Sequence, residues 1–503
     1  MVNEKNNVKI NSKVCLVNTA SRANSLSPPL GLMYIAAYLE KNGIEVDIVD
    51  IKRDFYSLLT ESHRKIVEDE ILEEIIKIKP ELIGIGCLVT EVEEVINLSK
   101  RIKEKLRDTL IIVGGIHASM YPGDLLFLDS PIDYVVIGEG EQTVNELVQV
   151  ACKGGTIAGN VKGVAWFDGF KVQKTIPRPP IKYLDEIPFP LYKKVDFNYY
   201  FKPNIYAIRN MLLSTAFIFT SRGCPYHCSF CVNKNIQKIM GSSYSLRSRS
   251  VINVVDEIEY LNKEFNIDGF YIYDDCFCIN KHYTLDFCKE ILKRKLRLIW
   301  AAETRVNLVS EELIKAMKDA GCVQLDFGVE SGSPEILKRL QKGITVRQIR
   351  DAFQWCHKLG IRCMANFMMN TPGETKEDIE KNLALAKEIN ANYYNFTIMT
   401  PYPGTDIYEC VSPKLSVKEY PLLIGGIRKL MDPRFKYANH DLDLCQITYS
   451  ANRSLNSLFR RASFILNKRY LWQIMRSKRK IQYLLSIGQL LKRMIRYLMG
   501  ETI

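Results

Sequence analysis

The sequence predicts an α/β protein with two parallel sheets and a helical C-terminal region. Three observations lead to this fold class. Short apolar runs alternate with helical stretches in two parts of the chain, a segment rich in glycine and proline lies between those parts, and strand-like runs stop beyond Pro403. Continuous apolar runs between helices are typical of parallel strands, whose sheets are covered by helices on both faces.

The first part extends from Lys13 to about Cys152 and contains five apolar runs. These lie at 14–18, 46–50, 82–86, 111–115 and 134–138, and helices such as the one expected at 91–107 separate them. The alternation predicts a doubly wound domain, in which ligands bind beyond the carboxyl ends of the strands. Three runs end in turns where glycine lets the backbone approach a ligand closely: Gly86, GGIHAS at 114–119 and GEGEQT at 138–143.

The second part contains six further runs, at 216–220, 269–275, 297–303, 323–330, 363–370 and 393–400. Helical segments of roughly 10 to 15 residues separate them, which predicts a partial barrel of about six parallel strands. The glycine and proline between the two parts indicate a connector with at most one hairpin. We therefore expect a first domain at 1–155, a linker at 156–210, a barrel domain at 211–410 and a helical region at 411–503.

The composition excludes several classes of protein. With 503 residues, of which 47% are hydrophobic and 25% charged, the chain resembles multidomain globular proteins and not disordered or low-complexity chains. The longest nearly uncharged apolar stretch, at 211–220, is shorter than the ~18 to 20 residues of a membrane span, and the polar start MVNEKNN lacks a signal peptide. We expect a cytoplasmic protein.

The net charge of +12 is concentrated at the C-terminus, where residues 451–503 contain twelve Lys or Arg and one acidic residue. Such a local excess argues against a nucleic-acid-binding protein. At 478–499, apolar residues recur at helical spacing opposite basic ones. The pattern fits either a helix on the inner membrane surface or one that covers a core, and the first reading would favour a lipid-like substrate.

Three of the fourteen cysteines lie close together, directly after the first strand of the second part. Cys224, Cys228 and Cys231 form a CxxxCxxC motif, and Gly223 and Pro225 favour a loop there. Three thiolates on one loop can hold three irons of a four-iron four-sulfur cluster and leave the fourth iron open. A zinc site completed by His227 and three unconnected buried cysteines are the alternatives. Cys276 and Cys278 fit small buried side chains better than further ligands.

The CxxxCxxC motif, with Phe230 before the third cysteine, resembles the signature of the radical S-adenosylmethionine (SAM) superfamily over 211–403. The resemblance implies that Cys224, Cys228 and Cys231 bind a cluster whose open iron holds the amino and carboxylate groups of SAM. It also implies that one electron, from a donor such as flavodoxin or ferredoxin, cleaves SAM to methionine and a 5'-deoxyadenosyl radical.

The resemblance extends to the ends of later strands. Asp274 and Asp275 resemble the contact to the SAM amino group, Arg305 the contact to its carboxylate and Glu330 the contact to its ribose. Acids beside an ammonium and a guanidinium on a carboxylate suit such a ligand. Asn370 stands where the family usually has Gly, on the adenine side. Helix capping or surface ion pairs are the alternatives for these residues, and Arg247 and Arg249 could equally lie on a solvated face.

The first part resembles the flavodoxin-like, Rossmann-like domain of the cobalamin-dependent radical SAM class. The similarity rests on PPLGLMYIAAYLE at 28–40, VGGIHAS at 113–119 and IGEGEQT at 137–143. It implies cobalamin contacts at Gly114, Gly115, His117, Gly138, Glu139 and Gly140. The DxHxxG pattern of proteins that ligate cobalt through histidine is missing from the sequence, so we expect a cobalt without a His lower ligand. The alternative for His117 is a loop residue bonded to backbone.

Together the resemblances imply an enzyme that transfers a methyl group through methylcobalamin to an unactivated carbon of a small-molecule or lipid-like substrate, with one SAM as methyl donor and a second as radical source. A neighbouring branch, similar to the anaerobic magnesium-protoporphyrin ester cyclase, performs ring closure without methyl transfer. A redox- or cobalamin-responsive binding protein without catalysis is the alternative from another class.

Overall fold

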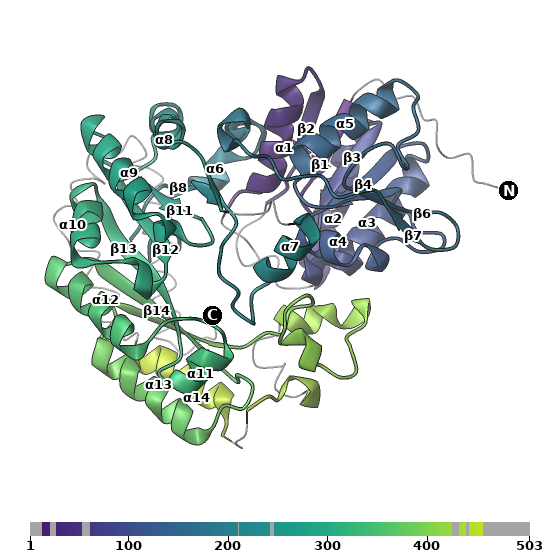
Figure 1. Ribbon diagram of the computed structural model, residues 1–503. Coiled ribbons are helices and arrows are strands. Elements are labelled where there is room, and N and C mark those ends of the chain that lie inside the picture. Colours follow the sequence, from purple (N-terminus) through teal and green to yellow (C-terminus); the bar gives the residue numbers. More distant parts are fainter. Residues whose placement is uncertain are drawn as a thin grey trace. The chain divides into compact units, whose positions relative to one another are not determined.

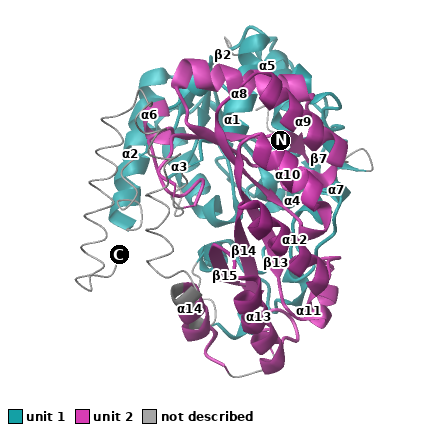
Figure 2. Ribbon diagram, turned by 90° about the vertical axis from the view of Figure 1, so that its left-hand side faces the viewer, with its two compact units in different colours: residues 1–196, 223–247, 400–436 teal, residues 197–222, 248–399, 437–503 magenta. Residues whose placement is uncertain are grey.

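The structure, a computed structural model, describes residues 13–20, 27–52, 61–209, 211–241, 246–424, 432–438 and 442–455 (Figure 1). The chain divides into two compact units (Figure 2). The first unit combines 1–196, 223–247 and 400–436, and the second combines 197–222, 248–399 and 437–503. Each unit is built around one large sheet.

The sheet of the first unit has the order β2-β1-β3-β4-β5-β6-β7. Five of its strands are parallel: β1 (Lys13–Val17), β2 (Glu45–Val49), β3 (Leu82–Gly86), β4 (Leu110–Gly114) and β5 (Tyr134–Val136). The order 2-1-3-4-5 is that of flavodoxin-like folds. The predicted doubly wound domain is therefore confirmed.

Helices cover both faces of this sheet. One face packs its core side chains against α1 (Leu30–Lys41) and α5 (Gly140–Cys152), which contact each other. On the other side lie α2 (Glu61–Ile78) and α3 (Val92–Lys105), also in mutual contact. The short α4 (Ile116–Met120) follows β4 directly. Because both faces are covered, the exposed carboxyl ends of the strands are the natural position for a ligand.

The predicted connector contains one hairpin, as expected, but the hairpin belongs to the sheet. Its strands β6 (Val164–Phe167) and β7 (Val172–Lys174) are antiparallel and extend the sheet beyond β5. An antiparallel edge on a parallel sheet is common in such folds. The alternating pattern of these short strands does not reveal which sheet they join.

The second unit contains six parallel strands in the order β15-β14-β13-β12-β11-β8. They are β8 (Thr215–Ile218), β11 (Gly269–Ile272), β12 (Ile299–Thr304), β13 (Cys322–Glu330), β14 (Arg362–Met369) and β15 (Tyr393–Ile398). Consecutive strands are neighbours throughout, which is the arrangement of a partial barrel. This prediction is confirmed too.

The helices between these strands cover one face of the second sheet, and side chains of the other face point inward. The main helices are α8 (Val251–Phe265), α9 (Lys281–Lys293), α10 (Glu311–Asp319), α12 (Val346–Leu359) and α13 (Lys376–Ile389), and α11 (Pro334–Arg339) is short. Phe270 of β11 and Trp300 of β12 pack on Phe287 of α9. Because side chains alternate along a strand, Tyr271 faces inward.

The region beyond residue 400 contributes to both units. In the first unit the 3-10 helix η9 (Val417–Ile424) contacts α3 and the 3-10 helix η2 (Val89–Glu91). In the second unit α14 (Leu444–Leu455) packs on β15, the edge strand. The segment 478–499, for which a basic amphipathic helix is predicted, lies outside the described residues. Within the described ranges, every helix is too short or too polar to cross a bilayer.

Candidate active site

The three motif cysteines lie on one loop of the first unit and are not joined by disulfides. Gly223, at φ +90°, opens the loop, and the Cys231 N–H donates to the Cys228 carbonyl over 3.0 Å. Cys228 is buried, whereas Cys224 and Cys231 are half-buried. Three cysteine side chains on one turn suit an iron–sulfur cluster. Across the described ranges, no set of three or more His, Cys, Asp or Glu side chains is arranged to hold a single metal ion.

Elements of the same unit hold the cysteine loop from two sides. Helix α7 (Asn233–Met240) starts two residues after Cys231, and its Gln237 amide donates to the Cys224 carbonyl over 2.6 Å. Ile407 N–H donates to the Ser229 carbonyl over 3.3 Å. The loop is therefore fixed both by the helix that follows it and by the segment 400–436.

Helix α7 also connects the cysteine loop with the predicted cobalamin turns. It contacts α4, and the Met240 side chain occupies the space where a Cβ on Gly138 would lie. Gly138 has φ +84° and Gly115 has φ +115°, and a Cβ on Gly115 would lie 2.8 Å from the Cys87 carbonyl oxygen. Both positions thus require glycine for reasons within the protein. The unit brings the cysteine segment to the ends of β4 and β5.

The carboxyl edge of the first sheet offers an apolar surface suited to a flat corrin ring. Leu88, just beyond β3, and Ile116, just beyond β4, are 52% and 44% exposed. The two strands are neighbours and end side by side, with Gly86 paired to Gly114. Large exposed apolar side chains beside glycine mark a binding surface. The residues present therefore fit cobalamin.

Two of the predicted cobalamin contacts have partners within the protein. Glu139 forms a two-pronged ion pair with Arg247, with distances of 2.7 and 3.1 Å, and also accepts from Ile181 N–H over 2.8 Å. Glu139 thus anchors the chain beyond the cysteine loop. Arg247 is buried, so the alternative that it lies on a solvated face is wrong. His117 is buried on α4, and its Nε2 lies 2.9 Å from an Asp124 carboxylate oxygen, so its partner is a side chain and not backbone.

Asp274 and Asp275 follow β11 in the second unit and differ in environment. Asp274 is buried and accepts four hydrogen bonds, from the N–H and hydroxyl groups of both Thr220 and Ser221. Burial raises its pKa to about 6, although these hydrogen bonds favour the charged form. Asp275 is exposed. Asp274 therefore fixes the chain just before the cysteine loop, and Asp275 is the acid that a ligand can reach.

Arg305 and Glu330 occupy the ends of adjacent strands and share a partner, Lys342, which the sequence does not indicate. The Lys342 Nζ lies 2.7 Å from Glu330, and the Arg305 guanidinium donates to the Lys342 carbonyl. All three residues are buried. Nothing in the surrounding QKGITV distinguishes Lys342 from a surface lysine, so only the fold reveals it. These three side chains bring a guanidinium, an ammonium and a carboxylate together at the carboxyl ends of β12 and β13.

Asn370 ends β14 with φ +65°, a conformation that favours Gly and tolerates Asn. Its side-chain oxygen accepts from Tyr437 N–H over 3.1 Å and from Ala438 N–H over 3.3 Å. The residue is fully buried. Its amide therefore holds the segment that leads to α14, and its backbone conformation explains why glycine is usual at this position.

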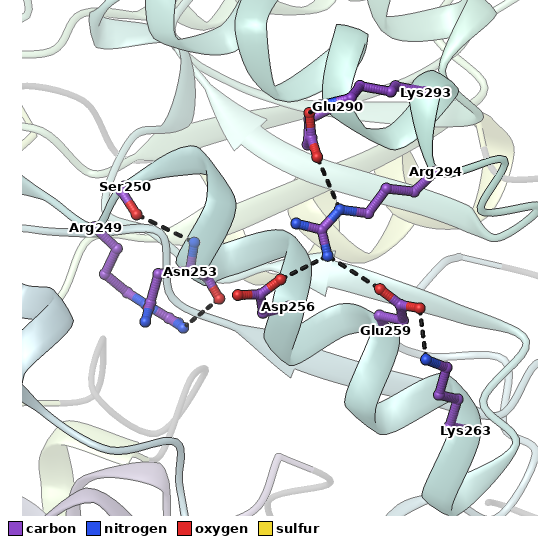
Figure 3. A network of polar contacts seen from close by, with 9 residues as sticks. All are labelled: Arg249, Ser250, Asn253, Asp256, Glu259, Lys263, Glu290, Lys293 and Arg294. Carbon is purple, nitrogen blue, oxygen red and sulfur yellow. Dashed lines mark hydrogen bonds and ion pairs between the residues drawn. The ribbon is translucent and has the colours of Figure 1, made fainter.

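Arg249, at the start of α8, is buried, so the solvated face is wrong for it as well. It pairs with the buried Glu257, donates to the Phe219 carbonyl over 2.9 Å, and donates to the Asn253 side chain over 2.7 Å. Figure 3 shows Arg249 with Ser250 and Asn253 at the start of α8, and Arg294 with Asp256 and Glu259 further along α8 and with Glu290 of α9. Arg249 joins β8 to α8 and is structural.

The inner face of the barrel contains a polar cluster that sequence reasoning missed. The Tyr271 hydroxyl lies 3.0 Å from Glu303 and 2.8 Å from Asp326, and burial raises the pKa of Asp326. A phenol has one proton, so both contacts are hydrogen bonds only when one carboxyl group is protonated. Cys276 and Cys278 are buried nearby in the chain, and burial raises the pKa of both thiols, which opposes a ligand role.

Two family models match the chain. The model described as "Radical SAM superfamily" matches residues 218–386, and the model described as "B12 binding domain" matches residues 18–148. The first range contains the cysteine loop and the strand ends with Asp275, Arg305 and Glu330. The second contains the glycine turns of the first sheet.

Relatives match over most of the chain. An uncharacterized methyltransferase of Pyrococcus horikoshii is 34% identical over 387 residues, which cover 76% of this chain and 78% of the relative. The anaerobic magnesium-protoporphyrin IX monomethyl ester cyclase of Rubrivivax gelatinosus is 30% identical over 401 residues, which cover 78% of this chain and 68% of the relative.

A solved structure shares the fold. The radical S-adenosylmethionine methyltransferase TsrM from Kitasatospora setae, with cobalamin and a 4Fe-4S cluster bound, aligns with a TM-score of 0.64 at 21% identity. The alignment covers 80% of this chain and 78% of that one. At this identity the likeness concerns the fold alone.

Proposed function

The chain belongs to the radical SAM superfamily and carries a B12-binding domain ahead of the radical SAM domain, and from this premise we propose that it is a methyltransferase acting on an unactivated carbon. Its cofactors are a four-iron four-sulfur cluster, SAM and cobalamin. The observation that carries the proposal is the packing of α7, which follows the cysteine loop, against α4 at the glycine turns. Both cofactor segments thereby belong to one compact unit.

When bound, the cluster supplies the electron that cleaves SAM to a 5'-deoxyadenosyl radical, and cobalamin carries the methyl group. Cys224, Cys228 and Cys231 would hold the cluster as thiolates. The backbone geometry of the loop is maintained by Gln237 and by the segment around Ile407. The chain's task here is to position three sulfurs and to leave one iron accessible.

For SAM we propose Asp275 as the contact to the ammonium, because it is the exposed acid of the pair. Asp274 instead holds the segment that follows β8, through its hydrogen bonds with Thr220 and Ser221. Arg305 would bind the carboxylate, and Glu330 the ribose hydroxyls. Lys342 orients Glu330 through their 2.7 Å ion pair and receives a hydrogen bond from Arg305 on its carbonyl. The three ligand contacts are thus held at neighbouring strand ends by side chains that cannot rotate freely.

For cobalamin we propose Leu88 and Ile116 as the apolar surface under the ring, together with Gly114. Gly115 and Gly138 shape the turns around them, and the Ser119 hydroxyl bridges the Gly115 carbonyl and the Gly138 N–H, with distances of 2.8 and 2.9 Å. The substrate is proposed to be a small molecule whose polar group meets Tyr271, Glu303 and Asp326. A one-electron donor protein is required as a redox partner.

Cyclisation without methyl transfer is the second candidate, because the Rubrivivax gelatinosus cyclase is 30% identical over much the same extent. A binding protein without catalysis has little support. Such a protein would not need an acid, a guanidinium and a second acid at neighbouring strand ends in addition to the cysteine motif.

Anaerobic turnover with SAM that carries a deuterated methyl group tests the proposal. The reduced, cluster-reconstituted protein should release 5'-deoxyadenosine and, with hydroxocobalamin and extract of its source cells, place the label in a product. The Cys228→Ser variant should lose both results together with its iron. Release of 5'-deoxyadenosine with an unlabelled cyclised product would favour the second candidate. No 5'-deoxyadenosine from the iron-loaded protein would refute both.

A further inference from the structure

His117, Asp124 and Tyr420 form a chain of side chains in the first unit. The Tyr420 hydroxyl donates to an Asp124 carboxylate oxygen over 2.8 Å, and His117 Nε2 lies 2.9 Å from the same oxygen. The imidazole stacks on Tyr121 and meets the Tyr420 ring edge-on. Tyr420 comes from η9, so the segment beyond the barrel strands takes part in this arrangement.

This geometry fixes the tautomer of His117. An ionised carboxylate only accepts hydrogen bonds, so the proton of the neutral ring must reside on Nε2. Nδ1 then carries a lone pair and is an acceptor. In the described part of the chain Nδ1 is buried and has no hydrogen-bond partner. A buried polar atom without a partner is costly, so a native protein pairs such an atom with an ordered water or with a ligand.

The position of His117 indicates which ligand this is. The residue lies two positions after Gly115 and next to the exposed Ile116, at the edge where cobalamin is proposed to bind. Cobalamin has amide side chains around its ring and an amide in the linker to its nucleotide. Because Nδ1 is shielded by the protein, a slender amide arm could reach it only with a small shift of the turn, and the ring and its cobalt could not.

We propose that His117 is a cobalamin-binding residue whose Nδ1 accepts a hydrogen bond from an amide N–H of the cofactor, with Asp124 and Tyr420 as positioning residues that fix its tautomer. This inference rests on the proposed function. It assigns His117 a hydrogen bond to the periphery of the cofactor and no bond to cobalt.

Titration of the full-length protein with hydroxocobalamin tests the proposal. His117→Leu should raise the Kd roughly three- to tenfold, the effect of one lost hydrogen bond; because this variant also loses its bond to Asp124, the Kd is measured well below the thermal midpoint of the cofactor-free variant. Tyr420→Phe, which leaves the ring in place, should raise the Kd by a smaller factor. His357→Leu is the matched control, because His357 bonds to the Ile389 carbonyl in the second unit, and its Kd should equal that of the wild type.

Repeating the titration with cobinamide, which lacks the nucleotide but keeps the ring amides and the linker amide, tests whether the donor is an amide. Equal losses with both corrinoids support the proposal, whereas a loss with hydroxocobalamin alone would place the contact at the nucleotide and overturn it. An unchanged Kd for His117→Leu with a lowered thermal midpoint overturns it in favour of a structural histidine.

The electron paramagnetic resonance spectrum of bound cob(II)alamin provides a second readout. We expect no nitrogen splitting that depends on His117. A splitting present in the wild type and lost in His117→Leu would make His117 a cobalt ligand and overturn the proposal. Failure of the wild type to bind hydroxocobalamin would instead contradict the proposed function.

Discussion

Asp274 and Asp275 are adjacent in the chain, yet their environments assign them different tasks. Asp274 is buried with four hydrogen bonds from Thr220 and Ser221, just before the cysteine loop. Asp274→Ala leaves those donors unpaired, so we expect a loss of about 2 to 4 kcal/mol in the free energy of unfolding and a lower iron content. Urea denaturation and iron analysis of the reconstituted protein measure both.

Asp275→Ala is the matched control for this prediction, because Asp275 is exposed. It should keep the stability and iron content of the wild type and raise the SAM concentration needed for half-maximal 5'-deoxyadenosine release. Similar losses of stability in the two variants would contradict the division of roles.

Asn370 provides a second prediction at the level of one residue. Its φ of +65° costs an alanine roughly 1 kcal/mol more than a glycine. Asn370→Gly and Asn370→Ala both lose the hydrogen bonds to Tyr437 and Ala438. We expect both to be destabilised, with the alanine variant about 1 kcal/mol less stable in urea denaturation. Equal stabilities of the two variants would show that the left-handed backbone conformation at residue 370 does not favour glycine over alanine.

These residues also mark what the sequence could predict about the site. The cysteine motif indicates its chemistry because three thiolates at that spacing have few other uses. By contrast, Asp274 and Asp275 look alike in YIYDDCF, and only the register of β8 and β11 shows which of them turns toward Thr220 and Ser221. Lys342 and the Tyr271 cluster have no sequence signal, because their partners are 12 or more residues away in the chain.

At the scale of elements, helix α8 has ion pairs of two kinds, and Figure 3 shows the surface kind around Arg294. Arg249 pairs with the fully buried Glu257, whereas Arg294 pairs at the surface with Asp256 and Glu259. Breaking a buried pair leaves a charge without compensation, so Arg249→Ala should cost about 3 kcal/mol or more. Arg294→Ala should lower the free energy of unfolding by at most about 1 kcal/mol, and by less in 1 M salt.

Urea denaturation of the two variants in low and high salt checks this prediction. The effect of Arg249→Ala should be nearly independent of salt, because solvent ions do not reach Glu257. A salt-sensitive Arg249→Ala, or a loss for Arg294→Ala as large as that for Arg249→Ala, would contradict the assignment of Arg249 to the core.

The turn between β14 and α13 contains a titratable element. Glu374 is fully buried and accepts from Asn370 N–H over 2.6 Å, and burial raises its pKa from 4.5 to about 7. Between these values the folded state binds more protons than the unfolded state, so Glu374 lowers stability as the pH rises through this window. In the Glu374→Gln variant, the free energy of unfolding should therefore fall less steeply as the pH rises. Above pH 7 it should exceed that of the wild type by up to about 3 kcal/mol.

Urea denaturation at pH 5, 6, 7 and 8 tests this sign. Glu377→Gln is the control, since Glu377 is exposed three residues further on, in the first turn of α13, and its pKa is lowered by hydrogen bonds to its backbone and to Thr375. A Glu374→Gln profile parallel to that of the wild type would show that Glu374 does not titrate in this range.

The strands could be predicted from the sequence where a strand is buried on both faces of its sheet, because such a strand consists of a continuous apolar run. The observed β13 differs from its predicted range by one residue, and β3 matches it. The hairpin strands β6 and β7 follow no such rule, because both are short and only partly buried, so their membership of the first sheet could not be predicted. The same limitation applies to contacts across long separations: Tyr420 and Asp124 are 296 residues apart.

At the scale of the whole molecule, the region beyond residue 400 is not an appendage. Its first segment supplies Tyr420 to His117 and Asp124 and packs η9 on α3 in the first unit. Its second segment covers the edge of the barrel, where the Asn452 side chain bonds to both the N–H and the carbonyl of Phe396, with distances of 2.9 and 3.1 Å. An uncovered edge strand invites pairing with other chains. The region thus stabilises each unit separately.

Two truncated chains separate these contributions. A chain ending at residue 436 retains η9 but lacks α14, so it should bind hydroxocobalamin with the affinity of the full chain while its barrel unit unfolds earlier and aggregates through β15. A chain ending at residue 399 lacks both segments, so it should lose cobalamin affinity as well. Corrinoid titration, with thermal unfolding and light scattering, distinguishes the two. If the chain ending at 436 also lost cobalamin, the second segment would matter to the first unit, and the two stabilising roles assigned here to η9 and α14 would not be independent.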